Sequence, residues 1–424
     1  MFLGSIILFV LASWLCGLAP TLPFLLAARV LQGAVAGPMI PLSQTLLLAS
    51  YPREKAPMAL SMWSMTTLIA GPVLGGWVSD NISWPWIFYV NIPVGIAAAI
   101  ATSAIFRDRD AAIRKAPIDT VGLALLVIWV GSLQIMLDKG KDLDWFNSTT
   151  IVVLALIAVI AFAFFIVWEL TEEHPVDLSL FELRNFTGGT IALSVGSAFI
   201  SAISCCRCGC KRISAIRRRT PVGLFAILLS PITGKFLLRT DPRYIATAAF
   251  LVFALCFWMR SRYTIGVDTW ALTVPTLIQG IGMAGFFIPL VSITLSGLPG
   301  HRIPAASGLS NFVRIMCGGI GTSIFSTAWE HRSIVHHAQL VEGANSYNPV
   351  FANSMQQMGA LGLPQDQTVG LYNSMATQQA AQLGVNDMFY ISAGIFVALI
   401  VLIWITRPKR SGGGDSSAAA SAAH

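Results

Sequence analysis

Charged residues are scarce in this chain, and the shortage excludes most classes of protein. Asp, Glu, Lys and Arg together make up 11% of the 424 residues, whereas soluble domains carry about 25%. The composition is therefore not that of an ordinary soluble enzyme, a disordered tail or a coiled coil. The 7 cysteines do not indicate a disulfide framework, because the chain is neither small nor marked as secreted.

Sequence motifs for catalysis are also missing. No Gly-Lys-Ser/Thr phosphate-binding loop, nucleophile elbow or zinc-protease motif occurs, so the sequence favours neither an ATP-driven protein nor an enzyme. The neighbouring His336 and His337 do not predict a metal site, because adjacent residues of a helix do not face together. The formal charge of +7 does not indicate nucleic-acid binding, because the basic residues lie in short loops between apolar runs.

Apolar sequence dominates instead, at 55% of the residues with a mean hydropathy of +0.70. A helix that crosses the bilayer needs about 20 mostly apolar residues. Twelve segments meet this requirement, and they predict an all-α polytopic membrane protein surrounded by lipid. The expected spans are residues 3–19, 22–48, 57–78, 86–106, 118–137, 149–168, 186–204, 221–238, 244–259, 270–296, 304–328 and 388–406.

The distribution of Lys and Arg predicts the orientation, because cytoplasmic loops are enriched in both. The bias favours a multi-pass protein with both termini in the cytoplasm, which places residues 330–387 on the outer side. Residues 204–219 oppose the bias, since they contain four cysteines and six basic residues on the side that should hold few.

Two distant segments share the same order of residues, which indicates either convergent use of Gly and Pro or a duplicated half. We favour duplication into two parallel halves, an arrangement in which a transporter binds its substrate near the midplane between them. The matching runs are Leu31-Gln32-Gly33 with Ile278-Gln279-Gly280, and Ile40-Pro41-Leu42 with Ile288-Pro289-Leu290.

Three ionisable residues fall inside or beside expected spans. A cation inside the membrane is costly, so Arg29 and Arg314 should face a polar cavity, unless Arg29 reaches the helix end by snorkelling. Asn311 lies one turn before Arg314 and would share that cavity. Asp138 ends the fifth span and is either a proton-coupling acid or a solvated interfacial residue beside Lys139.

Two motifs are similar to those of a known family. The run from Gly71 and Pro72 to Gly75 and Gly76 resembles the antiporter motif of drug:proton exchangers, and Arg29-x-x-Gln32-Gly33 resembles a fourth-helix motif linked there to proton transfer. Most of the chain resembles the fourteen-span drug:proton antiporters of the EmrB/QacA type within the major facilitator superfamily.

The resemblance implies a function and partners. It predicts an inner-membrane multidrug efflux transporter that exchanges hydrophobic drugs for protons, driven by the proton gradient without a cofactor. It also implies a periplasmic membrane-fusion adaptor and an outer-membrane channel as partners. It places Arg29, Gln32 and Gly33 on the proton and substrate pathway, and the cost of a cation inside the membrane adds Asn311 and Arg314 to that pathway.

The resemblance also divides the chain. Residues 1–106 would be a partial N-terminal half with family helices three to six, and 107–185 an extra helix pair with a cytoplasmic linker. Residues 186–406 would be the C-terminal half with the periplasmic segment 330–387, and 407–424 a flexible cytoplasmic tail. About twelve of fourteen family helices would then be present, which makes a truncated protein the expectation.

Residues 204–219 depart from the family pattern. A permitted back-translation from Cys205, read from its third base, spells Leu-Pro-Leu-Trp-Leu-Gln-Thr-Tyr-Ile-Gly-Tyr-Thr-Ala, which resembles the family at this place. The sequence therefore predicts a frameshift here. The alternative to an active antiporter is a non-transporting, truncated and frameshifted remnant of one.

Overall fold

The computed structural model is helical throughout its described part and contains no strand there. The described residues are 2–51, 78, 82–106, 119–140, 142–171, 178–205, 229, 232–237, 240–264, 268–299, 302–344, 347–359 and 365–407. Within these residues, seven helices are long and apolar enough to cross a membrane. They are Leu22–Gln44, Trp86–Ala104, Thr120–Lys139, Thr149–Thr171, Pro242–Arg260, Trp270–Leu295 and Asp366–Ile405.

Large apolar side chains cover the outside of these helices, as lipid exposure requires. Val159 in α9 (Thr149–Thr171) is 66% exposed and Val401 in α17 (Gln365–Ile405) is also 66% exposed. Water would penalise so continuous an apolar surface, whereas lipid tails do not. The expectation of an all-α polytopic membrane protein is confirmed.

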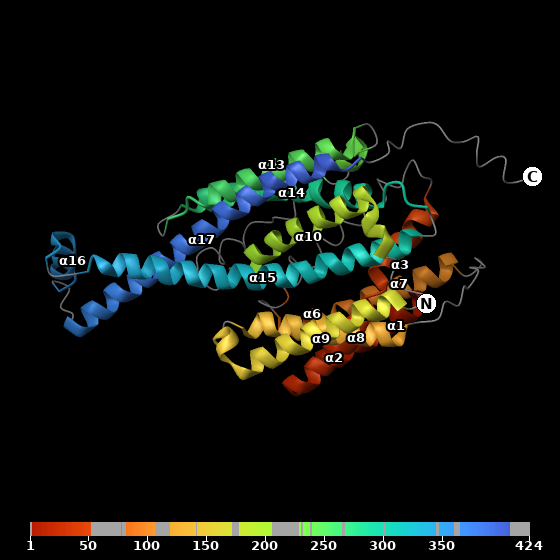
Figure 1. The fold of residues 1–424 in the computed structure, drawn as a ribbon, viewed down its shortest axis with the longest axis horizontal. Coiled ribbons are helices and arrows are strands. Elements are labelled where there is room, and N and C mark those ends of the chain that lie inside the picture. Colours follow the sequence, from red (N-terminus) through yellow and green to blue (C-terminus); the bar gives the residue numbers. More distant parts are fainter. Residues whose placement is uncertain are drawn as a thin grey trace, which may run out of the picture.

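The helices form two groups, one on each side of α15 (Ile303–Glu342) (Figure 1). The first group holds α1 (Phe2–Gly17), α2 (Leu22–Ala36), α6 (Trp86–Tyr89), α7 (Asn91–Phe106), α8 (Thr120–Lys139) and α9. The second holds α10 (Arg184–Cys205), α13 (Pro242–Arg260), α14 (Thr269–Leu295) and α17. Helix α15 packs against α10 and α17, and it also contacts α3 (Met39–Ser50) and α8.

A cluster of phenylalanines forms the core of the second group. Phe250, Phe253 and Phe257 of α13 pack against Phe286 of α14 and Phe396 of α17. All five side chains are fully buried, and aromatic pairs in such edge and stacked arrangements stabilise packing beyond the area they bury.

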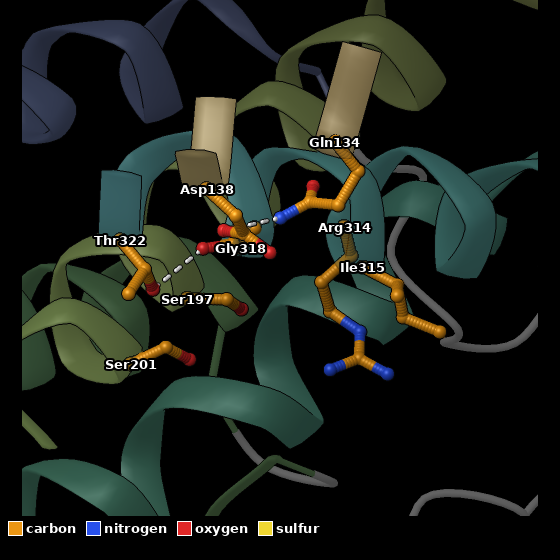
Figure 2. Close-up of a pocket in the computed structure, with 9 residues that line it drawn as sticks. Gln134, Asp138, Ser197, Ser201, Arg314, Ile315, Gly318 and Thr322 are labelled. Atoms are coloured by element: carbon orange, nitrogen blue, oxygen red, sulfur yellow. Dashed lines mark hydrogen bonds between the residues drawn. The ribbon is translucent and has the colours of Figure 1, made fainter. Parts of the chain in front are cut away.

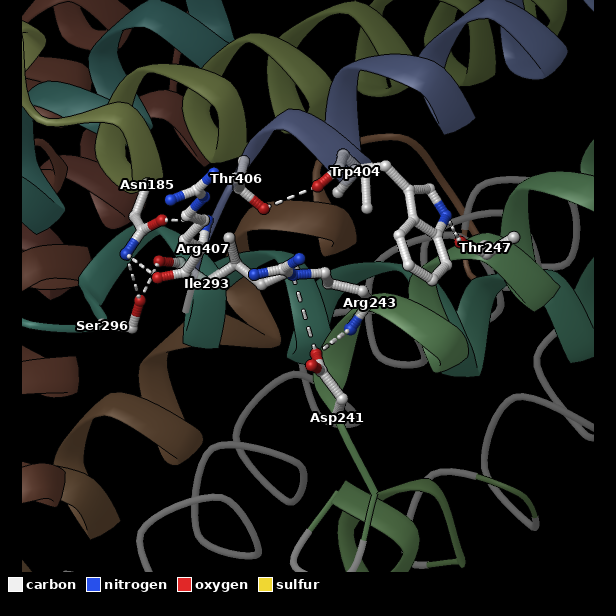
Figure 3. Close-up of polar contacts among 10 residues, drawn as sticks. Asn185, Asp241, Arg243, Thr247, Ile293, Ser296, Trp404, Thr406 and Arg407 are labelled. Atoms are coloured by element: carbon white, nitrogen blue, oxygen red, sulfur yellow. Dashed lines mark hydrogen bonds and ion pairs between the residues drawn. The ribbon is translucent and has the colours of Figure 1, made fainter. Parts of the chain in front are cut away.

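Polar contacts join the ends of three helices in this group (Figure 3). Asn185 at the start of α10 donates from Nδ2 to Ser296 Oγ, 3.2 Å, just beyond α14. The same amide binds the backbone of Arg407 after α17, accepting from its nitrogen at 2.7 Å and donating to its oxygen at 3.0 Å. These bonds hold the ends of α10, α14 and α17 together.

Several helices differ in extent from the predicted spans. The segment 22–48 is divided into α2 and α3 at Gly37 and Pro38, and 86–106 is divided into α6 and α7. Helices α15 and α17 are 40 and 41 residues long, or about 60 Å each, roughly twice the hydrocarbon thickness. Much of the 330–387 segment is therefore a continuation of two membrane helices, joined through α16 (Pro349–Gly359).

Candidate functional site

The Arg-x-x-Gln motif of α2 forms a polar cluster with α1. Gln32 is 5% exposed, and its Oε1 accepts a hydrogen bond of 3.0 Å from Arg29 Nη1. Its Nε2 donates to Ser13 Oγ of α1 at 2.7 Å, and the Cys16 thiol lies 3.8 Å from the same Oε1. The Arg29 guanidinium also lies over the Phe88 ring, 4.5 Å from its centroid, an attractive cation–π geometry.

Gly33, the third predicted residue of this motif, has open space around it. A Cβ added there would meet no atom within 4 Å. A glycine often allows another helix to pack closely against it. Among the described residues, no such close contact occurs at Gly33. Its place on the pathway remains a prediction.

A similar cluster occurs in the second group of helices. Arg260, the last residue of α13, donates from Nη2 to Gln279 Oε1 at 2.8 Å and to Thr276 Oγ1 at 3.3 Å. Arg260 falls just beyond the expected span 244–259, yet the structure buries it at 8% exposure. Its reach explains the difference, because a long side chain at a helix end can extend back along the neighbouring helix.

Tyr263 closes this cluster on the loop side. Its hydroxyl donates to the Ala271 carbonyl at 3.2 Å, and its own carbonyl accepts from Asn386 Nδ2 of α17 at 2.7 Å. Burial raises the pKa of Tyr263 to about 12, against the opposing influence of the Arg260 charge. The phenol is therefore a neutral hydrogen-bond donor at any physiological pH.

The predicted pair Asn311 and Arg314 belongs to a polar chain on α15. Arg314 Nη2 donates to Asn311 Oδ1 at 3.1 Å, and Asn311 Nδ2 donates to the Ser307 carbonyl at 2.9 Å. The Ser307 hydroxyl binds Gln44 Oε1 of α3. Both Ser307 and Gln44 are buried, so this chain links the two groups of helices through their interior.

Arg314 and Asp138 line the same pocket, which lies between α8, α10 and α15 (Figure 2). The cavity has a volume of about 360 Å³. Asp138 accepts a hydrogen bond of 3.2 Å from Gln134 Nε2 one turn earlier in α8. Among the described residues, Asp138 and Arg314 do not form an ion pair with each other. The lining is Gln134, Asp138, Ser197, Ser201, Arg314, Ile315, Gly318, Gly319 and Thr322.

Other predicted features lie elsewhere. The antiporter-motif residues Gly71, Pro72, Gly75 and Gly76 fall outside the described residues. His336 pairs with Asp387 Oδ2 at 2.8 Å rather than with His337. Within the described ranges, no group of three or more His, Cys, Asp or Glu could hold a metal ion.

Several buried polar residues of this site were not predicted from the sequence. Gln44, Ser197 and Ser307 are buried in apolar helices, and a neutral polar residue in an apolar run is a weak signal beside a charge. The signal that could have drawn attention to Ser307 is its position directly after the run Pro304-Ala305-Ala306.

Long apolar helices around a polar, charged interior define a multi-pass membrane transporter. Residues 1–322 match the Major Facilitator Superfamily, and the chain belongs to that family. It is 46% identical over 99% of its length to Multidrug export protein EmrB of Escherichia coli (strain K12), covering 84% of that protein. It is 43% identical to Fatty acid resistance protein FarB of Neisseria gonorrhoeae, covering 96% of this chain and 82% of FarB.

A solved structure supports the same fold. An auto-inhibited POT family peptide transporter matches with a TM-score of 0.53 at 12% identity, covering 98% of this chain and 83% of that one. At that identity the likeness concerns the fold alone. The predicted major facilitator fold is therefore confirmed by both the family match and the structural comparison.

Proposed function

We propose that this chain exports hydrophobic drugs across the inner membrane in exchange for protons. The observation that carries the proposal is the polar pocket of α8, α10 and α15, which holds both a carboxylate and a guanidinium among membrane helices. Asp138 is exposed at the end of α8 and Arg314 is partly buried in α15, and ionisable residues beside a cavity between membrane helices mark ion and substrate pathways. The names of the EmrB relatives support drug export as the activity.

Asp138 is the proposed proton carrier of the pocket. It is the only carboxylate in the lining, and a carboxylate can bind a proton on one side of the membrane and release it on the other. Arg314 provides a positive charge in the same pocket. Arg29, Gln32 and Gly33 are proposed to line the remaining pathway, as the family resemblance implies, together with Asn311 beside Arg314.

The proposed route for exported drug continues beyond the membrane. A periplasmic membrane-fusion adaptor and an outer-membrane channel would receive the drug, which keeps it from returning across the inner membrane. The extensions of α15 and α17 support this proposal, because they provide a folded, polar surface outside the expected hydrocarbon region.

Substitution of Asp138 tests the proposed exchange. Purified protein in liposomes that contain a pH-sensitive dye is given ethidium, and proton movement is followed. Asp138→Asn should lower drug-dependent proton movement by about tenfold or more, because a carboxamide cannot carry the proton. Asp142→Asn is the matched control, since Asp142 is an exposed carboxylate just after α8 and outside the pocket.

The outcomes separate the possible errors. Equal proton movement in the two variants would contradict the role of Asp138 while leaving antiport intact. Ethidium export without any proton movement in the unaltered protein would contradict antiport itself.

A second candidate is a non-transporting member of the family, favoured by the cysteine-rich and arginine-rich residues 204–219. It predicts that cells producing the chain are as drug-sensitive as cells with an empty vector. Increased resistance in those cells would exclude it.

A further inference from the structure

The two polar clusters are built on the same residue of the internal repeat. Gln32 and Gln279 occupy matching positions in the runs Leu31-Gln32-Gly33 and Ile278-Gln279-Gly280. Each glutamine is buried, at 5% and 6% exposure, and each accepts a guanidinium hydrogen bond on Oε1. The repeat therefore preserves an arginine–glutamine contact and not only a sequence pattern.

The arginine comes from a different place in each half. The run that ends at Cys16 in α1, Leu-Ala-Ser-Trp-Leu-Cys, aligns through its Leu and Trp with Leu-Cys-Phe-Trp-Met-Arg, which ends at Arg260 in α13. Position 16 in the first half thus corresponds to position 260 in the second. In the neighbouring helices, Arg29 and Thr276 correspond, since each lies three residues before its glutamine.

The contacts follow this correspondence. In the first half, Cys16 and Arg29 both contact Gln32 Oε1. In the second half, Arg260 contacts both Gln279 Oε1 and Thr276 Oγ1. The same three positions form each cluster, with the guanidinium on the second helix of the pair in one half and on the first helix in the other.

Neither guanidinium is neutralised within the described part of the chain. The ion pairs of Asp241 and Asp387 are formed with Arg243, Arg332 and His336, and include neither Arg29 nor Arg260. A glutamine oxygen accepts a hydrogen bond but carries no charge, so Gln32 and Gln279 do not neutralise the guanidinium groups that they bind. An unpaired charge among membrane helices is costly and is a mark of function.

The two charges also lie at a matching depth. Gln32 is ten residues into α2, which begins at Leu22, and Gln279 is ten residues into α14, which begins at Thr269. Ten helical residues correspond to about 15 Å, or roughly half the hydrocarbon thickness. The repeat therefore places each glutamine, with the guanidinium that it binds, at the same distance along its helix from the helix start.

We propose that Arg260 is a second positioning residue of the transport machinery, equivalent to Arg29, and that each half requires one guanidinium bound to its repeat-related glutamine. The helix that supplies the guanidinium is then interchangeable. This inference rests on the proposed transport function. It adds to that function the claim that the positive charge can be held at either of two positions in each half.

Relocation of the charge within one half is the test. Arg260→Cys removes the guanidinium, and the double variant Arg260→Cys with Thr276→Arg gives the second half the arrangement of the first. Arg260→Gln keeps a hydrogen-bonding side chain without charge. Arg262→Cys is the matched control, because Arg262 is exposed and lies over the Trp258 ring, outside the cluster.

Ethidium export by cells and membrane abundance are measured for every variant, and export is expressed per unit of protein. We expect Arg260→Cys and Arg260→Gln to lower export by about tenfold, and the double variant to restore it to within about twofold of the unaltered protein. Because export is measured directly, the test holds even if the transport of drug proves not to be coupled to protons.

Three results would overturn the proposal. Normal export by Arg260→Gln would reduce Arg260 to a hydrogen-bonding residue. A double variant that reaches normal abundance but does not export would show that position 276 cannot replace position 260. If the double variant fails to accumulate, and the reciprocal change Cys16→Arg with Arg29→Thr also fails, interchangeability is contradicted in both halves.

Discussion

Small residues along α15 allow two other helices to approach its backbone. A Cβ added at Gly319 would lie 2.3 Å from Gln134 Oε1 of α8, and one added at Gly321 would lie 2.5 Å from the Ala198 Cβ of α10. Both neighbours also belong to the surroundings of the pocket. The glycines therefore determine how closely the walls of the pocket approach one another, as small residues generally do between membrane helices.

We predict that Gly321→Ala destabilises the protein. The added methyl would also lie 3.3 Å from the Ala198 Cα, and backbone cannot move aside as a flexible side chain can. Overpacking of this kind costs about 1–3 kcal/mol, which should lower the thermal unfolding temperature in detergent.

Gly308→Ala provides the control on the same helix, because a Cβ there meets nothing within 4 Å. Alanine in an open helical position is favoured over glycine by about 0.5–1 kcal/mol. The two changes should therefore have opposite signs, and a stabilising Gly321→Ala would refute the packing argument.

At the level of single residues, the clearest signal in the sequence is a charge that interrupts an apolar run. Arg29 and Arg314 are visible in that way, and the structure places each in hydrogen bonds with a neighbouring amide, Gln32 or Asn311. Arg260 was missed because a cation at the end of a span looks like an ordinary loop residue. Only the tertiary structure, which places Gln279 beside the end of α13, shows that the Arg260 side chain binds Gln279.

At the scale of helices, the sequence predicted which helices exist better than it predicted where each helix ends. Hydropathy identifies the apolar part of α15 and α17, but both helices continue for several turns in polar sequence that hydropathy does not detect. Contacts between them explain the continuation: Trp329 Nε1 donates to the Ala381 carbonyl at 3.0 Å, and Arg332 and His336 both bind Asp387. Such pairing across a helical hairpin depends on tertiary structure.

The orientation of this hairpin remains a prediction, and two tyrosines can test it. Tyr347, between α15 and α16, is 97% exposed, and Tyr51 after α3 is 47% exposed. We expect a cysteine at position 347 to react with a membrane-impermeant maleimide in intact cells, because it follows a span that ends on the outer side.

A cysteine at position 51 should react only after the membrane is permeabilised, since it follows a span that ends inside. Each cysteine is the internal control of the other. The reverse pattern would place both termini outside and would invalidate the positive-inside argument for this chain.

At the scale of the whole molecule, the two groups of helices meet through few described contacts. Helix α15 contributes the main ones, with Ser307 bound to Gln44 of α3 and Ser323 bound to the Leu137 carbonyl of α8. The repeat and the family match predicted two halves, but not that one helix of the second half would contact both α3 and the extra pair. That arrangement depends on which small and polar residues face one another, which a hydropathy profile does not resolve.

We expect the basic residues between α10 and α13 to affect the assembly of the whole chain. They are Arg207, Lys211, Arg212, Arg217, Arg218 and Arg219; they lie outside the described residues, and the expected topology places them on the outer side. Translocation of basic residues opposes the positive-inside bias, and each would cost about 2.5–3.5 kcal/mol at the bilayer centre. We therefore predict that replacing all six with serine increases the amount of protein in the membrane.

The matched change removes four basic residues from the loop 107–118, Arg107, Arg109, Arg114 and Lys115, which should lie in the cytoplasm. Here serine should reduce the amount of correctly inserted protein, because these charges favour retention on the inner side. Quantitative immunoblots of membrane fractions, combined with labelling at position 347, measure both effects. If the two sets of substitutions change abundance in the same direction, the charges of residues 204–219 do not limit insertion, and the outer location assigned to that segment is wrong.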